Sequence, residues 1–595
     1  MIDMVLFGQL LGNFAGFFSG NEQLLLFWYY AFLLAGLVAS FALAFKFMKR
    51  HLKASSMTLF ALLVILTVFL FLELIFVTAT HLVYDDELIY AGIAKIIFES
   101  HIVGSCDFST ALHCVGGLPG VFQEPGGWPF LISISYAIHG INFGSGYGTT
   151  MVLALIGIAL VFFITMLLAE NENIAVIAAA SFAFIPLYMQ YARATMPDLP
   201  LLVFELLSML FLLLYLKEKK FIVGVAWVFA TAYALSIKVD GAILLVVLLA
   251  LFMTYRKSAG SNAKWKRRSW VAVIAIGALI VLPSLAFDYN AYATQSFGAN
   301  TVLGKFGFSY LEGNIGQNLL FWFGAYNNVQ LPYLNTSYVY HVEFPLMVTL
   351  FAIIGLVYLL YHRKYRIALQ LSLWFLIIFL FYSSYYGGGA LYSVGDDIRY
   401  LFPDFVVMAI LSSFGFFWVY RLLCKLVIKI GGRRVANTIK KPIFVVLLLI
   451  LFSSSAILFI TVVARPPSTI LGFAGERYDE NFITQNYQVV PNGCFVLTLT
   501  PQLWYVLNKS NIYLTWANES LYAPTLENLS HGCLYFDRDL SCYVSTRPGT
   551  TLNTEAECDY FMQTHVLQPV VVTHYNNFTW NATFGIYKIL GNSSS

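Results

Sequence analysis

The chain consists of long apolar runs separated by short polar segments. Twelve runs are apolar enough to predict membrane-spanning helices, which need about 20 apolar residues each when they cross a bilayer fully. Two of the runs are short and flank the polar residues 238–240, which predicts a hairpin that turns inside or near the membrane. The predicted spans lie near residues 24–45, 57–79, 149–168, 174–188, 199–216, 221–237, 241–255, 270–287, 344–361, 367–384, 402–420 and 443–463.

The segment after the second span combines charge with a helical pattern. Asp85, Asp86 and Glu87 directly follow the apolar run, and the apolar residues of 88–97 then recur at helical spacing. This pattern predicts a helix over 84–100 that lies on the membrane surface with its carboxylates at the water boundary. Carboxylates in a first turn also interact favourably with the helix dipole. Charge alone therefore leaves two interpretations open, an acidic helix start and a reactive site.

After residue 463 the apolar pattern changes to that of an outer domain. Its predicted elements are strands at 494–498, 512–515 and 569–573 and a helix start at 501–508, an alternation typical of a small α/β unit. The chain is thus predicted to contain an extra N-terminal transmembrane helix in 1–56, a membrane domain in 57–463 with its first outer loop at 80–148, and an outer domain in 464–595.

Composition agrees with a membrane protein. Hydrophobic residues make up 59% of the 595 residues and charged residues only 11%, whereas soluble domains carry roughly 25% charged residues. We therefore expect an α-helical polytopic protein of the cell membrane, with about 11–13 transmembrane helices and an extracytoplasmic C-terminal α/β domain. The net charge of +3 gives little information about partners, and no nucleic-acid partner is expected. The N-terminal residues predict no signal peptide.

Lysine and arginine indicate the orientation of the chain. When the spans alternate in direction, 23 of the 34 Lys and Arg residues fall in one set of loops, which the positive-inside rule assigns to the cytoplasm. The acidic residues 84–87 and everything after residue 463 then face outward. Seven Asn-x-Ser/Thr sequons agree, because all of them lie on this outer side: Asn335, Asn508, Asn518, Asn528, Asn577, Asn581 and Asn592.

The cysteines also agree with this orientation. Only Cys424 is predicted inside, and an even number of cysteines outside suits a compartment that permits disulfides. Cys106 and Cys114 are a plausible pair in the first outer loop, whereas the four later cysteines allow three connectivities. The disulfide candidates are Cys106, Cys114, Cys494, Cys533, Cys542 and Cys558.

Ionisable residues at helix ends gather on the predicted outer side. Charged groups at bilayer level are costly and therefore suggest a function. Both signs are present, so the set offers cations to hold a phosphate and carboxylates to activate a hydroxyl. The set comprises Asp85, Asp86, Glu87, Lys95, Glu124, Arg193, Asp198, Lys238, Asp240, Asp288, Asp396, Asp397 and Arg399.

Structural roles are alternatives for several of these residues. The tight turn around Pro197 favours a local ion pair between Arg193 and Asp198 as much as a role in a site. Lys238 and Asp240 likewise have charges that neutralise each other. The charges alone therefore do not decide which residues act in a site.

Five motifs occur in an order, spacing and sidedness typical of a known family. They are Asp86-Glu87 with Tyr90 and Ala94-Lys95, Phe122-Gln123-Glu124-Pro125 with Trp128-Pro129, Ile185-Pro186 through Arg193 to Pro197-Asp198, Ser236-Ile237-Lys238, and Arg399-Tyr400-Leu401-Phe402-Pro403. With these motifs the chain resembles the GT-C membrane glycosyltransferases, in particular the branch that contains protein O-mannosyltransferases and bacterial lipid A aminoarabinose transferases. The resemblance covers about residues 60–260 and 396–404.

The resemblance implies a hexosyl- or pentosyltransferase that moves a sugar, such as the hexose mannose, from a polyprenyl- or dolichyl-phosphate donor in the membrane. An acceptor hydroxyl on a glycan, lipid or protein would attack on the outer face with inversion. Asp86 is then expected to be the catalytic base, with Asp85 and Asp198 as further acidic candidates. Lys238, Arg399 and Arg193 are expected to bind the donor phosphate. Further site candidates are Glu87, Lys95, Glu124, Asp240 and Asp397.

The sequence departs from the family pattern at three positions. Glu124 stands where the family has a lysine, Ile89 stands where it has a basic residue, and Asp85 adds a carboxylate next to Asp86. Some relatives use a divalent metal, and Asp86 with Asp198 would be the pair to hold one. No other cofactor is expected.

Two other functions remain as alternatives. An oligosaccharyltransferase shares the architecture, but the Trp-Trp-Asp-Tyr-Gly motif of that class is missing from this sequence. A flippase or carrier for lipid-linked sugars would need a polar path to the cytoplasmic face. Glu73 and Glu205, which lie inside predicted spans, are the main hints of such depth.

Overall fold

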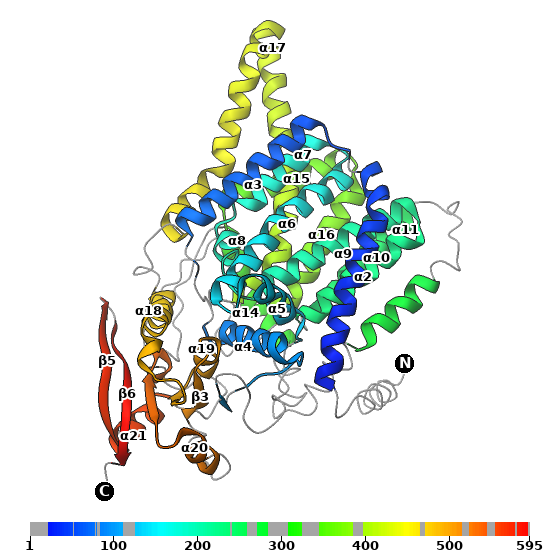
Figure 1. Ribbon diagram of the computed structural model, residues 1–595. Helices are drawn as coiled ribbons and strands as arrows, with labels where there is room; N and C mark the ends of the chain where they lie inside the picture. The colour runs from blue at the N-terminus through cyan, green and yellow to red at the C-terminus, as the bar shows by residue number, and fades with distance from the viewer. Residues whose placement is uncertain are drawn as a thin grey trace.

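A bundle of apolar helices and a smaller sheet domain at one end of it make up the structure, a computed structural model (Figure 1). The two parts are in contact through the helix that carries the acidic motif. The structure describes residues 22–51, 53–77, 79, 84–106, 108–110, 125–238, 241–258, 271–283, 307–323, 344–384, 397–463, 471–514, 523–543, 554–577 and 580–592.

The described helices confirm a polytopic α-helical protein. Seven are long and apolar enough to cross a membrane, and five shorter apolar helices accompany them. These twelve helices lie at the positions of the twelve predicted spans. The long spans belong to α2 (Glu22–His51), α3 (Ser56–Phe76), α6 (Phe143–Ala169), α9 (Asp198–Glu218), α16 (Tyr365–Ser383) and the two arms of α17 (Phe402–Leu458). The shorter ones are α7 (Glu172–Ala183), α10 (Phe221–Ile237), α11 (Ala242–Ser258), α15 (Leu346–Tyr361) and Val271–Pro283; α14 (Phe308–Trp322) precedes α15.

Helix α9 lies at the centre of the bundle. Its sequence is apolar on all sides, as expected for a helix that is surrounded by protein, and 94% of its most apolar stretch is buried. The turn that leads into α9 follows α8 (Pro186–Tyr191), which starts at a proline because proline fits the first turn of a helix. Asp198 is the first residue of α9 and is itself buried. The centre of the bundle therefore supports one of the predicted site residues.

Helix α17 is longer than the sequence predicted. The predicted spans leave 421–442 as a cytoplasmic loop, but these residues are helical on both sides of Gly432, where two helical arms join; the Gly432 φ of +75° suits glycine. The first arm, 402–431, is about 45 Å long at 1.5 Å per residue, whereas the hydrocarbon core of a bilayer is about 30 Å thick. The two arms project together from the end of the bundle opposite to the sheet (Figure 1).

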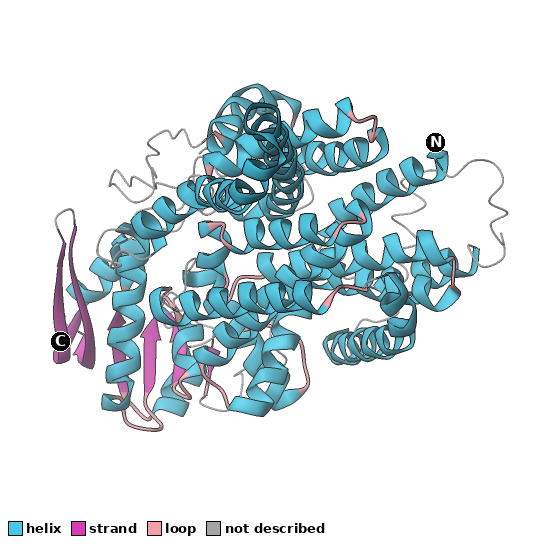
Figure 2. Ribbon diagram, turned by 90° about the horizontal axis from the view of Figure 1, so that it is seen from above, coloured by secondary structure: helices cyan, strands magenta, loops and turns pink. Residues whose placement is uncertain are grey.

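The outer domain is an α/β unit, as predicted. Its six strands lie in the order β1-β3-β2-β4-β6-β5 at one side of the molecule (Figure 2). β2 (Phe495–Thr498) lies between β3 (Ser510–Tyr513) and β4 (Leu534–Arg538) and is parallel to both, and the pairs β1–β3, β4–β6 and β5–β6 are antiparallel. The remaining elements are β5 (His565–Asn577), β6 (Trp580–Asn592), α18 (Leu471–Asn486), α19 (Pro501–Val506), α20 (Ala523–Ser530) and α21 (Thr554–Thr564).

Strand β1 (Phe108–Ser109) comes from the first outer loop of the membrane domain, not from the C-terminal region. Asn511 of β3 donates a side-chain hydrogen bond of 3.0 Å to the Ser109 hydroxyl. The sheet thus combines residues that are about 400 positions apart in the chain. Such a pairing was not predicted, because two residues carry no strand pattern of their own.

Two disulfides select one of the three connectivities of the late cysteines. Cys494–Cys533 joins the beginnings of β2 and β4, and Cys542–Cys558 joins the turn Leu540–Tyr543 to α21. Cys106 is also disulfide-bonded. Cys114, its predicted partner, lies outside the described residues.

Two buried carboxylates lie at the ends of the parallel strands. Asp537 accepts a hydrogen bond of 2.6 Å from the Trp504 indole, and Asp539 accepts one of 2.9 Å from the Thr500 hydroxyl, while the Thr498 hydroxyl contacts both carboxylates. Burial raises the pKa of Asp539 to about 6, against the effect of its hydrogen bonds. Burial also raises the pKa of Asp537, and the charge of Asp539 adds to that rise.

These shifts predict that the outer domain is more stable in acid. A carboxyl group with a raised pKa in the folded state stabilises fully below its unfolded pKa of about 4, and this contribution is lost as pH rises through about 6. The loss is about 1–3 kcal/mol, since one pKa unit corresponds to about 1.4 kcal/mol. Hydrogen exchange of β2 and β4 in the full-length protein, corrected for intrinsic exchange rates, measures this loss of stability as the difference between pH 5 and pH 7.5.

Asp537→Asn should flatten this pH dependence, because it removes one titrating group and the repulsion between the two carboxylates. Asp559→Asn is the matched control, since Asp559 is exposed on α21 of the same domain. Equal pH dependence in Asp537→Asn and in the unchanged protein would contradict the assignment.

Candidate active site

Helix α4 (Tyr84–Ser100) carries the acidic motif and has the bounds that the sequence predicts. Most of its apolar side chains are covered by other parts of the protein. Ile93 and Ile97 pack with residues of α2 and of α5 (Gly127–His139), whereas Leu88 belongs to the core of the outer domain. The apolar positions therefore face protein on two sides. The helical spacing was a correct signal, but it did not reveal what covers the helix.

Glu87 and Trp128 bind the backbone of Thr195 on both sides of its Cα. A Glu87 carboxylate oxygen accepts a hydrogen bond of 2.5 Å from the Thr195 N–H, and the Trp128 indole donates one of 2.8 Å to the Thr195 carbonyl. Glu87, Trp128 and Thr195 are all buried. These contacts fix the turn between α8 and α9 against α4 and α5. Asp198, three residues after Thr195, is placed by the same turn.

Two cations converge on the Asp198 carboxylate. Lys238 Nζ lies 3.0 Å from Asp198 Oδ1, and Arg399 Nε lies 3.4 Å from Asp198 Oδ2. The three side chains are only 4–7% exposed. They come from the start of α9, the end of α10 and the 3₁₀ turn Asp397–Leu401. Because an isolated buried charge is costly, the three residues depend on each other.

Arg399 connects this cluster to the acidic motif. Its Nη2 lies 3.8 Å from Asp86 Oδ2, and the Asp86 side chain is 47% exposed. Desolvation raises the pKa of Asp86, Arg399 and Lys238 lower it, and Asp198 raises it. Solvent access limits the effect of the desolvation. Asp86 is thus the accessible carboxylate beside a mostly buried group of charges.

Tyr400 completes the group on the side of the two cations. Lys238 Nζ lies 4.1 Å from the centre of the Tyr400 ring, and Arg399 donates a hydrogen bond of 3.3 Å to the Tyr400 hydroxyl. The ring stacks on Tyr382 with the centroids 5.3 Å apart. Neither tyrosine was a predicted site residue. Tyr400 lies inside the Arg-Tyr-Leu motif, which was the only signal for it.

Arg193, a predicted phosphate ligand, has other partners in the structure. Its guanidinium donates hydrogen bonds of 3.0 Å and 2.7 Å to the carbonyls of Glu73 and Val77, at the end of α3. Cations favour the C-terminal end of a helix because of the helix dipole. Nor does Arg193 form the local ion pair with Asp198 that the turn suggested. These contacts, both made by Nη1, indicate a structural role.

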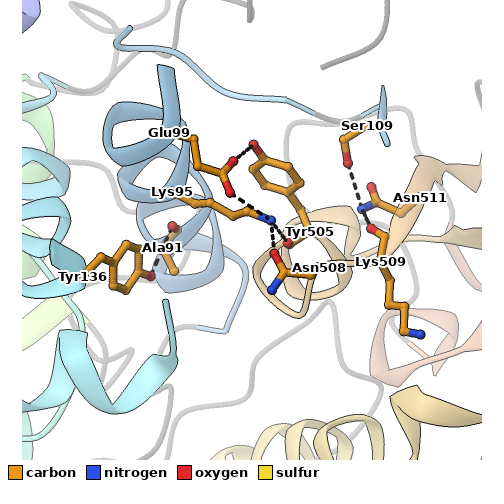
Figure 3. Close-up of polar contacts among 9 residues, drawn as sticks. All are labelled: Ala91, Lys95, Glu99, Ser109, Tyr136, Tyr505, Asn508, Lys509 and Asn511. Atoms are coloured by element: carbon orange, nitrogen blue, oxygen red, sulfur yellow. Dashed lines mark hydrogen bonds and ion pairs between the residues drawn. The ribbon is translucent and has the colours of Figure 1, made fainter. Parts of the chain in front are cut away.

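Lys95, another site candidate, points into the outer domain instead (Figure 3). Its fully buried Nζ donates hydrogen bonds of 2.6 Å to the Tyr505 carbonyl and 2.8 Å to Asn508 Oδ1, and it lies 4.0 Å from the Tyr505 ring centre. Burial lowers the pKa of Lys95 to about 8, against the charge of Glu99. Lys95 therefore joins α4 to α19. It is not one of the charges around Asp198.

Other contacts support the same interface. Gly92 approaches α19 so closely that an added Cβ would clash with the Gln502 side chain. The Glu99 carboxylate accepts a hydrogen bond of 3.2 Å from the Tyr505 hydroxyl. Farther along, the Tyr147 hydroxyl of α6 donates one of 3.2 Å to Glu480 of α18. The outer domain thus holds the helix that bears Asp86.

Four further site candidates cannot be placed in the site. The side chains of Asp85 and Asp397, and residues Glu124 and Asp240, lie outside the described residues.

Within the described chain, no group of three or more His, Cys, Asp or Glu side chains is arranged to hold a metal. A metal held by Asp86 and Asp198 would have to displace Lys238 or Arg399, because both oxygens of Asp198 face these cations.

Replacing Lys95 tests the contact between α4 and the outer domain. Lys95→Met keeps the length of the side chain but leaves the Tyr505 carbonyl and Asn508 without their donor, which costs about 1–3 kcal/mol. We expect faster hydrogen exchange in α4 and α19 of the full-length protein. Lys588→Met, at an exposed position of β6, is the control and should change neither helix. Unchanged exchange of α4 in Lys95→Met would refute the proposed contact.

Comparison with known proteins gives one family match. The family model of dolichyl-phosphate-mannose-protein mannosyltransferases matches residues 123–287, which include Trp128, Asp198 and Lys238. No curated protein sequence matches the chain significantly.

Solved structures share the fold at low sequence identity. Apo ArnT from Cupriavidus metallidurans is 13% identical, with a TM-score of 0.54, and the alignment covers 88% of this chain and 97% of that chain. ArnT bound to undecaprenyl phosphate is 12% identical, with a TM-score of 0.50 and coverages of 90% and 98%.

The archaeal oligosaccharyltransferase AglB from Archaeoglobus fulgidus, in complex with an inhibitory peptide and a dolichol-phosphate, is 13% identical. Its TM-score is 0.50, and the alignment covers 89% of this chain and 74% of that chain. The matched family segment, the shared fold and the order of the motifs agree with one another. Residues 123–287 thus match the mannosyltransferase family model, and the chain shares the fold of ArnT and AglB, in agreement with the resemblance to GT-C membrane glycosyltransferases.

Proposed function

We propose that this glycosyltransferase moves a sugar, such as a hexose, from a polyprenyl- or dolichyl-phosphate donor to an acceptor hydroxyl at the extracytoplasmic face, with inversion. The observation that carries the proposal is the convergence of Lys238 and Arg399 on Asp198, with Arg399 also reaching towards Asp86. Two cations and one accessible carboxylate are what the reaction needs. Glycan, lipid and protein acceptors all fit this chemistry.

Lys238 and Arg399 are proposed to bind the donor phosphate. A guanidinium and an ammonium group offer several N–H donors to phosphate oxygens. Asp198 holds the two cations side by side before the donor arrives, so less reorganisation is needed at binding. The description of the matched family names a dolichyl-phosphate sugar, and ArnT and AglB were solved with undecaprenyl phosphate and dolichol-phosphate. These names support a lipid phosphate as the leaving group.

Asp86 is proposed to act as the catalytic base. Its carboxylate takes the proton of the acceptor hydroxyl while the hydroxyl oxygen forms a bond to the anomeric carbon of the sugar. The bond from that carbon to the phosphate oxygen breaks, and the lipid phosphate leaves with the electron pair. Lys238 and Arg399 stabilise the charge that develops on the phosphate. Attack from the face opposite to the leaving group inverts the sugar carbon.

Three features support an extracytoplasmic site. Lys and Arg concentrate in the loops of the other side. The outer domain has two disulfides, which are typical of oxidising compartments. The predicted glycosylation sequons lie on the same side as Asp86. Because α4 packs against the disulfide-bonded domain, Asp86 and that domain share one side of the membrane.

The fold shared with AglB favours a second candidate, an oligosaccharyltransferase. Such an enzyme would transfer an oligosaccharide where our proposal has a single sugar. A carrier without transferase activity would move the lipid-linked sugar and break no bond. The donor that is turned over therefore distinguishes the three functions.

Asp86→Asn tests the base. With purified protein and single-sugar polyprenyl phosphates, we expect turnover to fall by about 10²–10⁴-fold, the usual effect of losing a general base. Donor binding should persist, because Lys238 and Arg399 remain. Nucleotide sugars should not be turned over by either protein. The paired variant Asp85→Asn should retain more activity.

Unchanged turnover in Asp86→Asn would move the base to Asp85 or Asp198. Absence of turnover in the unchanged protein, with tight lipid binding that is insensitive to mutation, would favour the carrier.

Arg399→Lys tests phosphate binding. Lysine keeps a positive charge beside Asp198 but loses the planar guanidinium that also approaches Asp86. We expect the KM for the lipid-phosphate donor to rise about tenfold, equal to about 1.4 kcal/mol. Arg193→Lys is the control and should change KM less than about twofold, because Arg193 binds the α3 carbonyls. A larger effect of Arg193→Lys than of Arg399→Lys would reverse the assignment.

A further inference from the structure

A polar pocket lies at the end of the bundle away from Asp86. It has a volume of about 90 Å³, is partly open to solvent, and lies where the ends of α6, α7, α15 and α16 meet α17. Its wall includes Tyr358, Phe414, Phe417 and Trp418. Glu170 lines it and pairs with Lys217 in the last turn of α9, whose first residue is Asp198. A helix of 21 residues spans about 30 Å, so the pocket is on the opposite side of the membrane from Asp198.

The pocket has an excess of positive charge. Lys364 and Arg421 line it, and neither has a carboxylate partner within the described part of the chain. The Lys364 ammonium lies 5.9 Å from the Tyr358 ring centre. The acidic residue that lines the pocket, Glu170, forms an ion pair of 3.1 Å with Lys217, so its negative charge is already compensated. The segment 421–442, which continues from the pocket along α17, contains seven Lys and Arg and no Asp or Glu. An anion is therefore the ligand that this charge distribution favours.

Apolar side chains lie next to the cations on the outside of the bundle. Tyr361 is 74% exposed and Leu422 is 58% exposed, one residue after Arg421. The Tyr361 ring stacks near Trp418, with the centroids 6.3 Å apart. Exposed apolar residues on a membrane helix face lipid chains, and Trp and Tyr concentrate at the membrane–water interface. The site thus offers cations for a headgroup and an apolar path for a chain.

We propose that this pocket binds a phosphate-bearing lipid from the leaflet opposite to the one that faces Asp86. Lys364 and Arg421 hold the phosphate, and the chain follows Tyr361 and Leu422. The bound lipid takes no part in the glycosyl transfer. It would stabilise the end of the bundle from which the two arms of α17 project.

The test counts lipid bound to the purified full-length protein. Phosphatidylglycerol and phosphatidylcholine are added to delipidated protein in detergent, and retained lipid is measured by native mass spectrometry. We expect Lys364→Gln with Arg421→Gln to weaken phosphatidylglycerol retention about tenfold, because two charge-assisted contacts to phosphate are lost. Arg421→Lys should retain most of the binding, since it keeps the charge.

The matched control is Arg363→Gln with Lys425→Gln, which removes the same charge from neighbouring positions that do not line the pocket. It should change retention less than about twofold. Equal loss in the control and the pocket variant would overturn the proposal, because general surface charge would then explain the binding. Displacement of the lipid by inorganic phosphate alone would also overturn it and assign the site to a free anion. Retention of the lipid against millimolar phosphate supports the lipid ligand.

Discussion

The buried contacts of Asp198 with Lys238 and Arg399 are the constraint on which the site depends. Each of these side chains would be costly to bury alone, since an unpaired charge in a low-dielectric interior loses its hydration. Their pairing fixes the start of α9, the end of α10 and the turn before α17 relative to each other. The same pairing holds two cations close together. In the proposed function, the atoms that stabilise this part of the fold are also the ones that would bind the donor phosphate.

The position of Asp86 depends on a second part of the chain. Helix α4 has the outer domain on one side and α2 and α5 on the other. Lys95 anchors it to α19, and Glu87, through the Thr195 peptide, connects it to the turn that leads into Asp198. The outer domain therefore directly supports the helix that carries Asp86, and strand β1 of the first outer loop is a second connection between the two parts.

Much of the fold was predictable because its signals are local. Apolar runs and their lengths predicted the spans, and helical spacing predicted the bounds of α4. The strands β2, β3 and β5 were expected from short apolar segments, but β4 and β6 were not, and β4 contains the buried Asp537 that hides its pattern. The extension of α17 through a basic segment was missed, because charge was taken as the sign of a loop although lysine and arginine form helices well.

By itself the sequence determined the membrane class and the concentration of Lys and Arg in one set of loops, and it predicted a short set of site residues. These follow from hydropathy, from the positive-inside rule and from motif order, all of which act along the chain. Only the tertiary structure decided how those charges pair. Lys238 and Arg399 meet Asp198, whereas Arg193 caps α3 and Lys95 joins the outer domain. Such choices depend on how helices pack and where long side chains reach, and spacing along one helix carries no information about its neighbours.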